Sequence, residues 1–372
     1  MAHVLVTGGS GFVGSHLVDE LLDNGHRVRV LDVFSAQVHG SENADCARVS
    51  EELEVLRGDV RDRSLVSKAV HGVEYVFHLA ASVGVGQSMY EIADYVSANS
   101  YGAAVLLDVI VNDGCRPKKM VVASSMSIYG EGLYECERCG KVSPELRSRQ
   151  QLEAREWEMC CPLCSGLARI LPTPEDKALF PASIYAITKR DHEEMFLSVG
   201  RAYNIPTIAL RYFNIYGPRQ SLSNPYTGVM AIFSSRFLNM KPPIIFEDGG
   251  QKRDFIHVND IVRANLLAMT STVDYGVFNV GTGRPLSVGQ VADILRQRLA
   301  PDIQPVVENR FRAGDIRHCI ADTSRARQQL GFTSTIKFED GINGYLDWVQ
   351  KQMAEDRMDS ARNELSRKGL IL

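Results

Sequence analysis

Tyr185 and Lys189 stand four positions apart near the start of a predicted helix over 183–203. Side chains at i and i+4 lie on one face of a helix, so the phenol and the ammonium can meet. A phenol has a reference pKa of about 10 and is a poor base at neutral pH, but a neighbouring cation stabilises the phenolate and lowers that pKa. The pair could therefore move a proton to or from a bound hydroxyl group. The same spacing also occurs on ordinary surface helices, so the pair needs support from elsewhere in the chain.

A serine-rich segment gives that support. The predicted strand over 119–124 runs into Ser124-Ser125-Met126-Ser127. In open α/β sheets, ligands bind beyond the carboxyl ends of the strands. A hydroxyl at this edge can share the substrate proton with the tyrosine and lysine.

A glycine-rich turn between the first predicted strand and the first predicted helix is typical of a phosphate-binding loop. Gly8, Gly11 and Gly14 have the spacing G-x-x-G-x-x-G. Such glycines permit a tight turn, close approach of a pyrophosphate and packing of the helix on the sheet, while the helix N-terminus meets the phosphates with free N–H groups. A purely structural turn is the alternative. A predicted strand precedes the turn and a predicted helix follows it, and this context favours a dinucleotide site.

Asp32 ends the second predicted strand, 18 residues after Gly14. A carboxylate there can accept hydrogen bonds from an adenosine ribose and would repel a 2′-phosphate. The pattern therefore predicts NAD rather than NADP, with a plain turn residue as the alternative for Asp32. A nicotinamide would also complete the proton-transfer pair, because its positive charge stabilises a phenolate and a hydride moves at the carbon that carries the hydroxyl.

Five of the eight cysteines crowd between positions 136 and 164. Cys136 and Cys139 form one C-x-x-C pair, Cys161 and Cys164 form a second, and 21 residues separate the two pairs. This spacing is near that of a four-cysteine zinc ribbon, and in a reducing cytosol such a cluster binds metal more often than it forms disulfides. A closed set of four thiolates predicts a structural zinc. Cys160 is an alternative ligand to Cys161, and free or disulfide-bonded cysteines are the alternative to a metal site.

Alternating strands and helices must position these residues. Strands are expected at 4–7, 27–32, 53–56, 73–80, 119–124 and 207–212, and helices at 12–24, 94–113 and 183–203. This alternation predicts an α/β fold with a Rossmann-type, doubly wound parallel sheet and right-handed crossovers.

The rhythm of elements also predicts a division into domains. Residues 1–130, 173–217 and about 251–281 are expected to form an NAD-binding domain, and residues 218–250 and 282–350 a smaller α/β substrate domain. Residues 131–172 hold the clustered cysteines and little strand pattern, so they are expected to be an insertion with a zinc-ribbon-like structure. Residues 351–372 are charged and predict a solvated or fraying helix or tail.

The composition excludes several classes of protein. The chain has 372 residues, 41 basic and 45 acidic, with a net charge of −4; hydrophobic residues make up 45% and charged residues 23%. These values exclude a largely disordered or fibrous chain and argue against a nucleic-acid partner, which needs a basic face. No apolar stretch reaches the roughly 18 residues of a membrane span, and the N-terminus has no signal-like pattern, so we expect a cytoplasmic protein without a membrane partner.

Several motifs, in order along the chain, resemble those of the extended short-chain dehydrogenases/reductases that act on nucleotide sugars. They are T-G-G-S-G-F-V-G at 7–14, H-L-A-A at 78–81, Asn99, S-S-M-S-I-Y-G at 124–130, Y-A-I-T-K at 185–189, R-Y-F-N-I-Y-G-P-R at 211–219, R-D-F-I-H-V-N-D at 253–260 and R-A-G-D at 312–315. The resemblance covers nearly the whole chain apart from the insertion and the tail.

This resemblance implies roles for individual residues. Ser125, Tyr185 and Lys189 would be the catalytic triad. A tightly bound NAD would contact Gly8, Gly11, Phe12, Val13, Gly14, Asp32, Asp59, Val60, Ala80, Ala81, Asn99, Tyr185 and Lys189. A nucleotide-diphosphate sugar would contact Ser125, Ser127, Asn214, Arg219, Arg253, Arg312 and Asp315. Guanidinium groups suit phosphate oxygens, although a single arginine can equally form a surface ion pair. Members of the family are often homodimers, so a homodimer is expected.

The two residues after Ser125 favour one of the reactions that the family carries out. The 4,6-dehydratases that the chain resembles carry Asp and Glu there, and the pentose-forming decarboxylases usually keep the Glu; this chain has Met126 and Ser127. Neither can protonate a leaving hydroxyl as a carboxylic acid would. The resemblance therefore implies a 4-epimerase, which oxidises C4 to a 4-keto sugar and returns the hydride to the other face. A 4,6-dehydratase, a 4-ketoreductase and an NAD-binding sensor or partner-binding protein stay as alternatives. The run at 217–229 looks like a subgroup that acts on dTDP-L-rhamnose, with UDP-glucose as the rival sugar.

Overall fold

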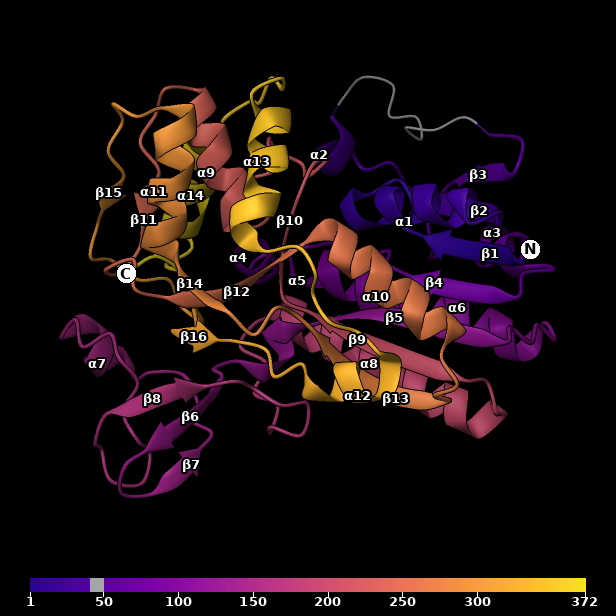
Figure 1. Ribbon diagram of the computed structural model, residues 1–372, viewed down its shortest axis with the longest axis horizontal. Coiled ribbons are helices and arrows are strands. Elements are labelled where there is room, and N and C mark those ends of the chain that lie inside the picture. Colours follow the sequence, from indigo (N-terminus) through magenta and orange to yellow (C-terminus); the bar gives the residue numbers. More distant parts are fainter. Residues whose placement is uncertain (41–49) are drawn as a thin grey trace.

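A seven-stranded parallel sheet forms the centre of the molecule (Figure 1). The computed structural model describes residues 1–40 and 50–372. The strands are β1 (His3–Thr7), β2 (Arg27–Asp32), β3 (Leu53–Arg57), β4 (Tyr75–His78), β5 (Lys119–Ser125), β9 (Thr207–Tyr212) and β13 (Tyr275–Val280). Their order is β13-β9-β5-β4-β1-β2-β3, and every neighbouring pair is parallel. The predicted doubly wound sheet is confirmed, and its order reverses between β1 and β4, where such sheets bind ligands.

Helices cover both faces of this sheet. The helices α1 (Phe12–Asp23), α10 (Val258–Thr270) and α12 (Ser324–Leu330) pack on one face, and α3 (Arg63–Val70), α6 (Gly102–Asn112) and α8 (Ile184–Tyr203) pack on the other. Successive strand residues point to opposite faces, so Val4 and Val6 join the first core while Leu5 joins the second. The strands read as almost continuous apolar runs because both faces of the sheet are buried.

The long helix predicted over 94–113 is interrupted. It is built from α5 (Ile92–Tyr95), a π-helical turn η1 (Val96–Tyr101) and α6. Gly102 follows the π-helical turn, and a Cβ there would lie 2.7 Å from a methyl group of Val60. π-helical turns often mark functional sites, and this one carries Asn99.

A smaller mixed sheet lies beside the large one. It contains β10 (Asn214–Tyr216), β12 (Lys252–His257), β14 (Pro285–Ser287) and β16 (His318–Cys319), and a separate pair joins β11 (Ile244–Ile245) to β15 (Val306–Val307). The helices α9 (Val229–Leu238), α11 (Val288–Leu299) and α13 (Phe338–Val349) supply its hydrophobic core. The short helices α2 (Ala36–His39), α4 (Val85–Ser88) and η2 (Met126–Tyr129) lie in connections. The predicted domain boundaries stay a prediction.

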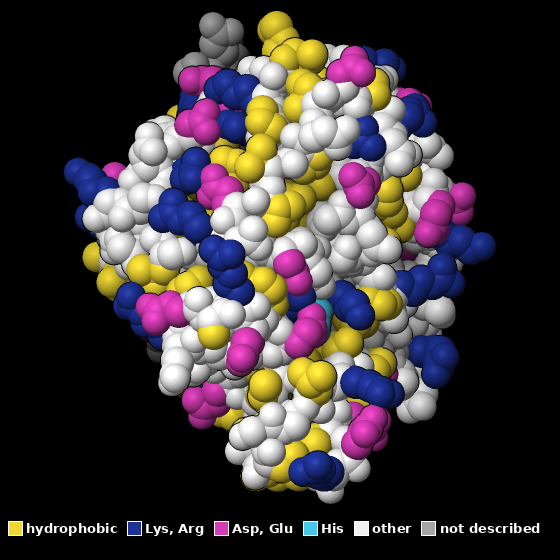
Figure 2. Space-filling model, turned by 90° about the vertical axis from the view of Figure 1, so that its left-hand side faces the viewer, with side chains coloured by type: hydrophobic (Ala, Val, Ile, Leu, Met, Phe, Trp, Pro, Cys, Tyr) yellow, Lys and Arg dark blue, Asp and Glu magenta, His cyan; other side chains and the backbone are white. Residues whose placement is uncertain are grey.

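Residues 131–172 contain a three-stranded antiparallel sheet of their own, which projects from the body at the lower left of Figure 1. Its elements are β6 (Leu133–Cys136), β7 (Gly140–Val142), α7 (Arg149–Glu153) and β8 (Ala168–Leu171). These strands were not predicted because they are short and carry exposed charged residues such as Glu135 and Lys141. In Figure 2 this part forms the lowest lobe, and side chains of both charges gather where it joins the rest.

The C-terminal segment contains the expected helix, but it is packed against the body and is not solvated or frayed. Helix α14 (Met358–Arg367) buries an apolar stripe that includes Met358 and Leu365. Ile371 pairs with the backbone of Arg312, and the stripe packs against Phe246. Charge dominates the composition of this segment, but apolar residues spaced along one helical face decided its packing. Among the described residues, no helix is long and apolar enough to cross a membrane.

Candidate active site and cysteine cluster

Ser125, Tyr185 and Lys189 meet at the carboxyl end of β5. Ser125 ends that strand, and Tyr185 and Lys189 lie in the first two turns of α8. Ser125 lies beside Tyr185, close enough to lower the pKa of the phenol. Lys189 Nζ donates to the carbonyl of Ala123, 2.9 Å away. Ser183 caps the helix by accepting a hydrogen bond from the backbone N–H of Ala186, which fixes where the first turn begins.

Burial shifts the pKa of both titratable groups in this set. Desolvation raises the pKa of Tyr185 to about 12, against a smaller opposite effect of the Ser125 hydrogen bond. Desolvation alone lowers the pKa of Lys189 to about 7. Two buried imidazoles, His78 and His192, lie next to Lys189 with ring centres 5.1 Å apart. Burial, and after it the charge of Lys189, lowers the pKa of each imidazole, so both favour the neutral form.

The two residues after Ser125 carry no carboxyl group. Ser127 donates from its backbone N–H and from its hydroxyl to Ser125 Oγ, at 3.1 and 2.9 Å. Met126 is buried and packs with Tyr129 and Phe213. Ser127 therefore lies in contact with the catalytic hydroxyl, while Met126 faces the protein interior.

The glycine turn forms a cradle at the sheet's reversal point. Gly8 has φ +71°, and a Cβ there would lie 2.7 Å from the backbone nitrogen of Ala80. A Cβ on Gly14 would lie 2.1 Å from the carbonyl oxygen of Gly8. Gly11 precedes α1, and no described side chain caps that helix end. Its first N–H groups are thus available to a phosphate, which fits a dinucleotide.

Four more of the predicted cofactor residues lie in α1 or just after β4. Phe12 and Val13 open α1, and Val13 packs against the core. Ala80 and Ala81 follow β4, the strand beside β1. These four positions agree with a dinucleotide that crosses the sheet at the β1–β4 reversal.

Asp32 and Asp59 end the neighbouring strands β2 and β3 or follow them closely. Asp32 is buried, and its carboxylate accepts hydrogen bonds from the backbone N–H groups of Ser10 and Phe34, both at 2.9 Å. It thereby fixes the glycine turn to the end of β2. The guanidinium of Arg61 binds the Asp59 carboxylate and lowers the pKa of Asp59. Val60 is buried next to Asp59, on the side of the sheet covered by α3 and α6.

Asn99 lies in the π-helical turn η1, and its predicted contact with the cofactor stays a prediction. Its side chain is fully buried. The amide oxygen accepts from the backbone N–H of Ser82 at 2.7 Å, and the amide nitrogen donates to the Ser82 carbonyl and to Thr188 Oγ1 at 3.1 and 2.9 Å. Both amide hydrogens are used, so Asn99 holds the segment after β4 against the catalytic helix.

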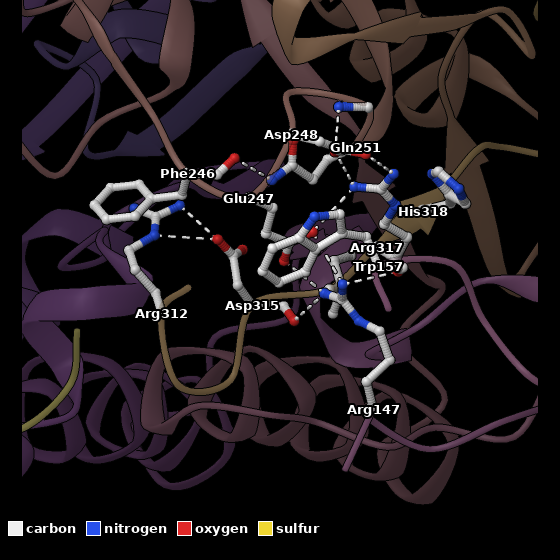
Figure 3. Close-up of polar contacts among 12 residues, drawn as sticks. Arg147, Trp157, Phe246, Glu247, Asp248, Gln251, Arg312, Asp315, Arg317 and His318 are labelled. Atoms are coloured by element: carbon white, nitrogen blue, oxygen red, sulfur yellow. Dashed lines mark hydrogen bonds and ion pairs between the residues drawn. The ribbon is translucent and has the colours of Figure 1, made fainter. Parts of the chain in front are cut away.

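Arg253, Arg312 and Asp315 lie together near the start of α8. The carboxylate of Asp315 is 2.7 Å from the Arg312 guanidinium and 3.7 Å from that of Arg253. The Arg312 guanidinium also lies over the ring of Phe246, 4.9 Å from its centre (Figure 3). A Cβ on Gly314 would lie 2.9 Å from the carbonyl of residue 182, three positions before Tyr185. Two cations thus border the catalytic helix.

Asn214 offers an unused acceptor. Its Oδ1 is buried and has no hydrogen-bond partner among the described residues. A buried polar atom without a partner costs free energy, so it fits a position that a ligand completes.

Arg219 is paired with another element, and its predicted substrate contact stays a prediction. Its guanidinium forms an ion pair with Asp19 on α1, with N and O 2.7 Å apart. His16, also on α1, donates to the carbonyl of Pro218 at 2.9 Å. The two contacts fasten the loop after β10 to the outer side of α1.

The four predicted metal ligands converge. The four Sγ atoms all lie within 4.8 Å of one another; they belong to Cys136, Cys139, Cys161 and Cys164. Backbone N–H groups of residues 138 and 139 lower the pKa of Cys136, which favours the thiolate that binds a metal. Cys160 is outside this group, and its backbone pairs with Leu167. The geometry therefore selects Cys161 over Cys160.

Several residues that position the site were missed by the sequence analysis. Ser88 is fully buried, and its hydroxyl oxygen accepts from the backbone N–H of Tyr185 at 3.0 Å. Glu193 accepts from Ser124 Oγ at 2.7 Å and from Arg211 Nε at 2.9 Å. Glu193 lies one turn beyond Lys189 on the same face of the helix, so a charged residue on a buried face was the available signal. Ser88 gave no signal because its partner is far away in the sequence.

The chain matches the model of a family described as the NAD dependent epimerase/dehydratase family over residues 4–147 and 167–281. The residues between these two ranges, 148–166, belong to the inserted segment.

Curated and solved relatives match along most of their length. A dTDP-L-rhamnose 4-epimerase from Burkholderia thailandensis is 32% identical over 355 residues, which cover 94% of this chain and 95% of the relative. A UDP-glucose 4-epimerase from Thermotoga maritima, solved with UDP-glucose, has a TM-score of 0.76 and 32% identity and covers 94% of this chain and 99% of its own. A UDP-glucose 4-epimerase from Thermus thermophilus, solved with NAD, has a TM-score of 0.72 and 28% identity, with coverages of 94% and 100%.

Proposed function

The chain belongs to the NAD-dependent epimerase/dehydratase family, and we propose that it is an NAD-dependent nucleotide-sugar 4-epimerase. One observation carries the proposal: Ser125, Tyr185 and Lys189 converge, and the side chains after Ser125 are a hydroxyl and a buried thioether. The first feature permits proton transfer at a sugar hydroxyl. The second leaves out the acid that a 4,6-dehydratase would need. Epimerisation at C4 requires only the first feature.

The glycine cradle and the free N-terminus of α1 fit the pyrophosphate of NAD. Asp32 ends β2, where its carboxylate can accept a hydrogen bond from a ribose hydroxyl. Its negative charge disfavours a 2′-phosphate. Bound there, NAD would supply an acceptor for the hydride of C4 and the means to return it to the other face. A cofactor that is regenerated in every cycle needs no external reductant, which favours tight retention.

The residues of the triad have distinct tasks. Tyr185 removes the proton of the C4 hydroxyl, and Ser125 donates a hydrogen bond to the same oxygen while it becomes a carbonyl. Burial disfavours an isolated phenolate and an isolated ammonium, but the two charges stabilise each other when Tyr185 and Lys189 are charged together. After the 4-keto sugar has turned in the site, Tyr185 returns the proton. The product then has the opposite configuration at C4 and the same mass.

The substrate's diphosphate is proposed to lie against Arg253 and Arg312, with Asn214 Oδ1 accepting a hydrogen bond from the ligand. Asp315 holds the two guanidinium groups in place. Arg219 is left out of this set because it pairs with α1. The sugar is proposed to be dTDP-L-rhamnose or a UDP-hexose, the two classes named for the relatives.

The cysteine cluster is proposed to hold one structural zinc ion. Four thiolates within 4.8 Å suit the tetrahedral, sulfur-rich coordination of zinc. All four positions of the tetrahedron would be filled by protein, so the ion would stabilise the insertion and take no part in the reaction. A homodimer, a cytoplasmic location and the lack of nucleic-acid and membrane partners are further expectations from the sequence.

A product assay without added reductant tests the function. Purified protein is incubated with dTDP-L-rhamnose, UDP-glucose, UDP-galactose, UDP-glucuronate and dTDP-glucose, and the products are separated and identified by NMR. A C4 epimer of unchanged mass is expected from one of them. A product lighter by one water would indicate a dehydratase, and consumption of NADPH on a keto sugar would indicate a reductase. Either result would overturn the proposal.

A further inference from the structure

A largely buried cluster of charged side chains joins the inserted segment to the residues proposed to bind the diphosphate (Figure 3). We call it the interface cluster. It consists of Glu131, Arg147 and Glu158 from the insertion and of Glu247, Asp248, Arg317 and His318 from the body of the protein.

Arg147 joins the insertion to the body through buried hydrogen bonds. Its side chain and that of Glu247 are each 1% exposed. The guanidinium binds both carboxylate oxygens of Glu247, at 2.9 and 2.8 Å, and also donates to the carbonyls of Trp157 and Asp315. One side chain thereby holds the insertion, the segment before β12 and the segment before β16 in a fixed relation.

Arg317 approaches the same carboxylate from the body. Its guanidinium donates to Glu247 at 3.0 Å, to Asp248 at 2.6 and 2.9 Å and to Glu158 at 3.1 and 2.6 Å. Glu158 also bonds His318 Nε2 at 3.0 Å. Glu131 accepts from the backbone N–H of Arg317 at 2.6 Å. Side chain and backbone of residue 317 are therefore both held by the insertion.

This segment in turn positions the proposed diphosphate ligands. The Arg253 guanidinium donates to the carbonyls of Ile316 and Arg317, at 2.7 and 2.8 Å. Arg312 is held by the Asp315 carboxylate, and the carbonyl of Asp315 is bound by Arg147. The contacts form one chain from the insertion, through residues 315–317, to both guanidinium groups.

We propose that Arg147 and Glu158 are positioning residues for substrate binding: the insertion uses them to hold Arg253 and Arg312 in the orientation that receives the diphosphate. The proposal rests on the proposed function, because that function assigns the diphosphate to these two arginines. It predicts that damage to the cluster weakens binding of the nucleotide and leaves the proton-transfer triad intact. A buried ion pair is costly unless its geometry is good, so a pair kept at this junction fits a role in orientation.

The test compares Arg147→Met with Arg149→Met. Arg149 lies in the same insertion and forms an exposed ion pair with Glu153, so it is a matched control for the loss of one guanidinium. Glu158→Gln is the milder variant, since Arg317 keeps Asp248 and Glu247 as partners. Binding of UDP and of dTDP is measured by calorimetry, well below the unfolding temperature, together with bound NAD, zinc content, KM and kcat.

The expected result for Arg147→Met is a nucleotide Kd and a substrate KM raised about ten-fold or more, as for the loss of a hydrogen bond to a charged group, with NAD retained and kcat within about two-fold of wild type. Glu158→Gln should shift Kd in the same direction by about three-fold, and Arg149→Met should leave it unchanged. Folded Arg147→Met and Glu158→Gln proteins with wild-type Kd would overturn the proposal. So would a wild-type protein that binds neither nucleotide. Wild-type protein that binds a nucleotide but epimerises no sugar would overturn only the proposed function.

Discussion

Gly14→Ala is expected to expel NAD from the protein. The added Cβ would lie 2.1 Å from the carbonyl oxygen of Gly8 and 2.7 Å from Gly9 Cα, and both are backbone atoms that cannot rotate away. Non-bonded heavy atoms prefer about 3.5 Å or more, so the turn and the first turn of α1 must separate by over about 1 Å. Overpacking of this kind costs about 1–3 kcal/mol, and here it also displaces the N–H groups that face the pyrophosphate.

The assay measures NAD released from the denatured protein, per mole of chain, and the melting temperature. Gly344→Ala is the control because Gly344 lies in α13 with no heavy atom within 4 Å of the added Cβ. Alanine there should leave NAD unchanged and stabilise the helix by up to about 1 kcal/mol. Gly14→Ala should lose most of its NAD and melt several degrees lower. A Gly14→Ala protein with one NAD per chain and an unchanged melting temperature would refute the reasoning about the cradle.

Three further predictions concern the triad, the cysteine cluster and the interface cluster. Tyr185→Phe should reduce kcat by about 10²–10⁴-fold and keep NAD bound, and near-normal turnover would exclude a proton-transfer role. Cys136→Ser should lower zinc content and melting temperature, whereas Cys160→Ser should change neither; a zinc-free Cys136→Ser protein that melts normally would contradict a structural metal. Hydrogen bonds from His318, which has the larger effect, and from Arg317 lower the pKa of Glu158 to about 2. Since the folded-state pKa is depressed, this stabilisation is present above the unfolded pKa of about 4.3 and is lost as pH falls toward 2. Glu158 is half exposed, so solvent screening limits the effect to about 1 kcal/mol. Urea unfolding at pH 7 and pH 3 should therefore show a smaller change in the free energy of unfolding for Glu158→Gln than for wild type.

Local patterns predicted the sheet and the centre of the site. The strand over 27–32 and the turn at Gly8 were readable because their determinants, apolar runs and glycine spacing, lie within a few residues. Tyr185 and Lys189 were readable because helical periodicity places them on one face. The four cysteines were readable because metal-ligand spacing is local within each pair.

Contacts between distant segments could not be predicted from the sequence. Arg147, Glu247 and Arg317 are each unremarkable charges in the sequence, and only the folded chain brings them together in a buried cluster. Arg219 matched a motif, yet a carboxylate at Asp19 is its partner. Asn99 also matched a motif, but its amide is used to join two segments of the protein. In each case the partner lies far along the chain, where spacing carries no information.

The fate of deuterium at C4 distinguishes return of a hydride from removal of a proton at carbon. The substrate found in the product assay is prepared with deuterium at C4 and converted in ordinary water by protein with its own bound NAD. Because the hydride leaves C4 and returns to the same carbon, we expect the C4 epimer to retain the deuterium and no solvent hydrogen to enter the sugar. An epimer that has lost the label to solvent would show that a proton is removed from carbon, and it would contradict transient oxidation of C4 to a 4-keto sugar.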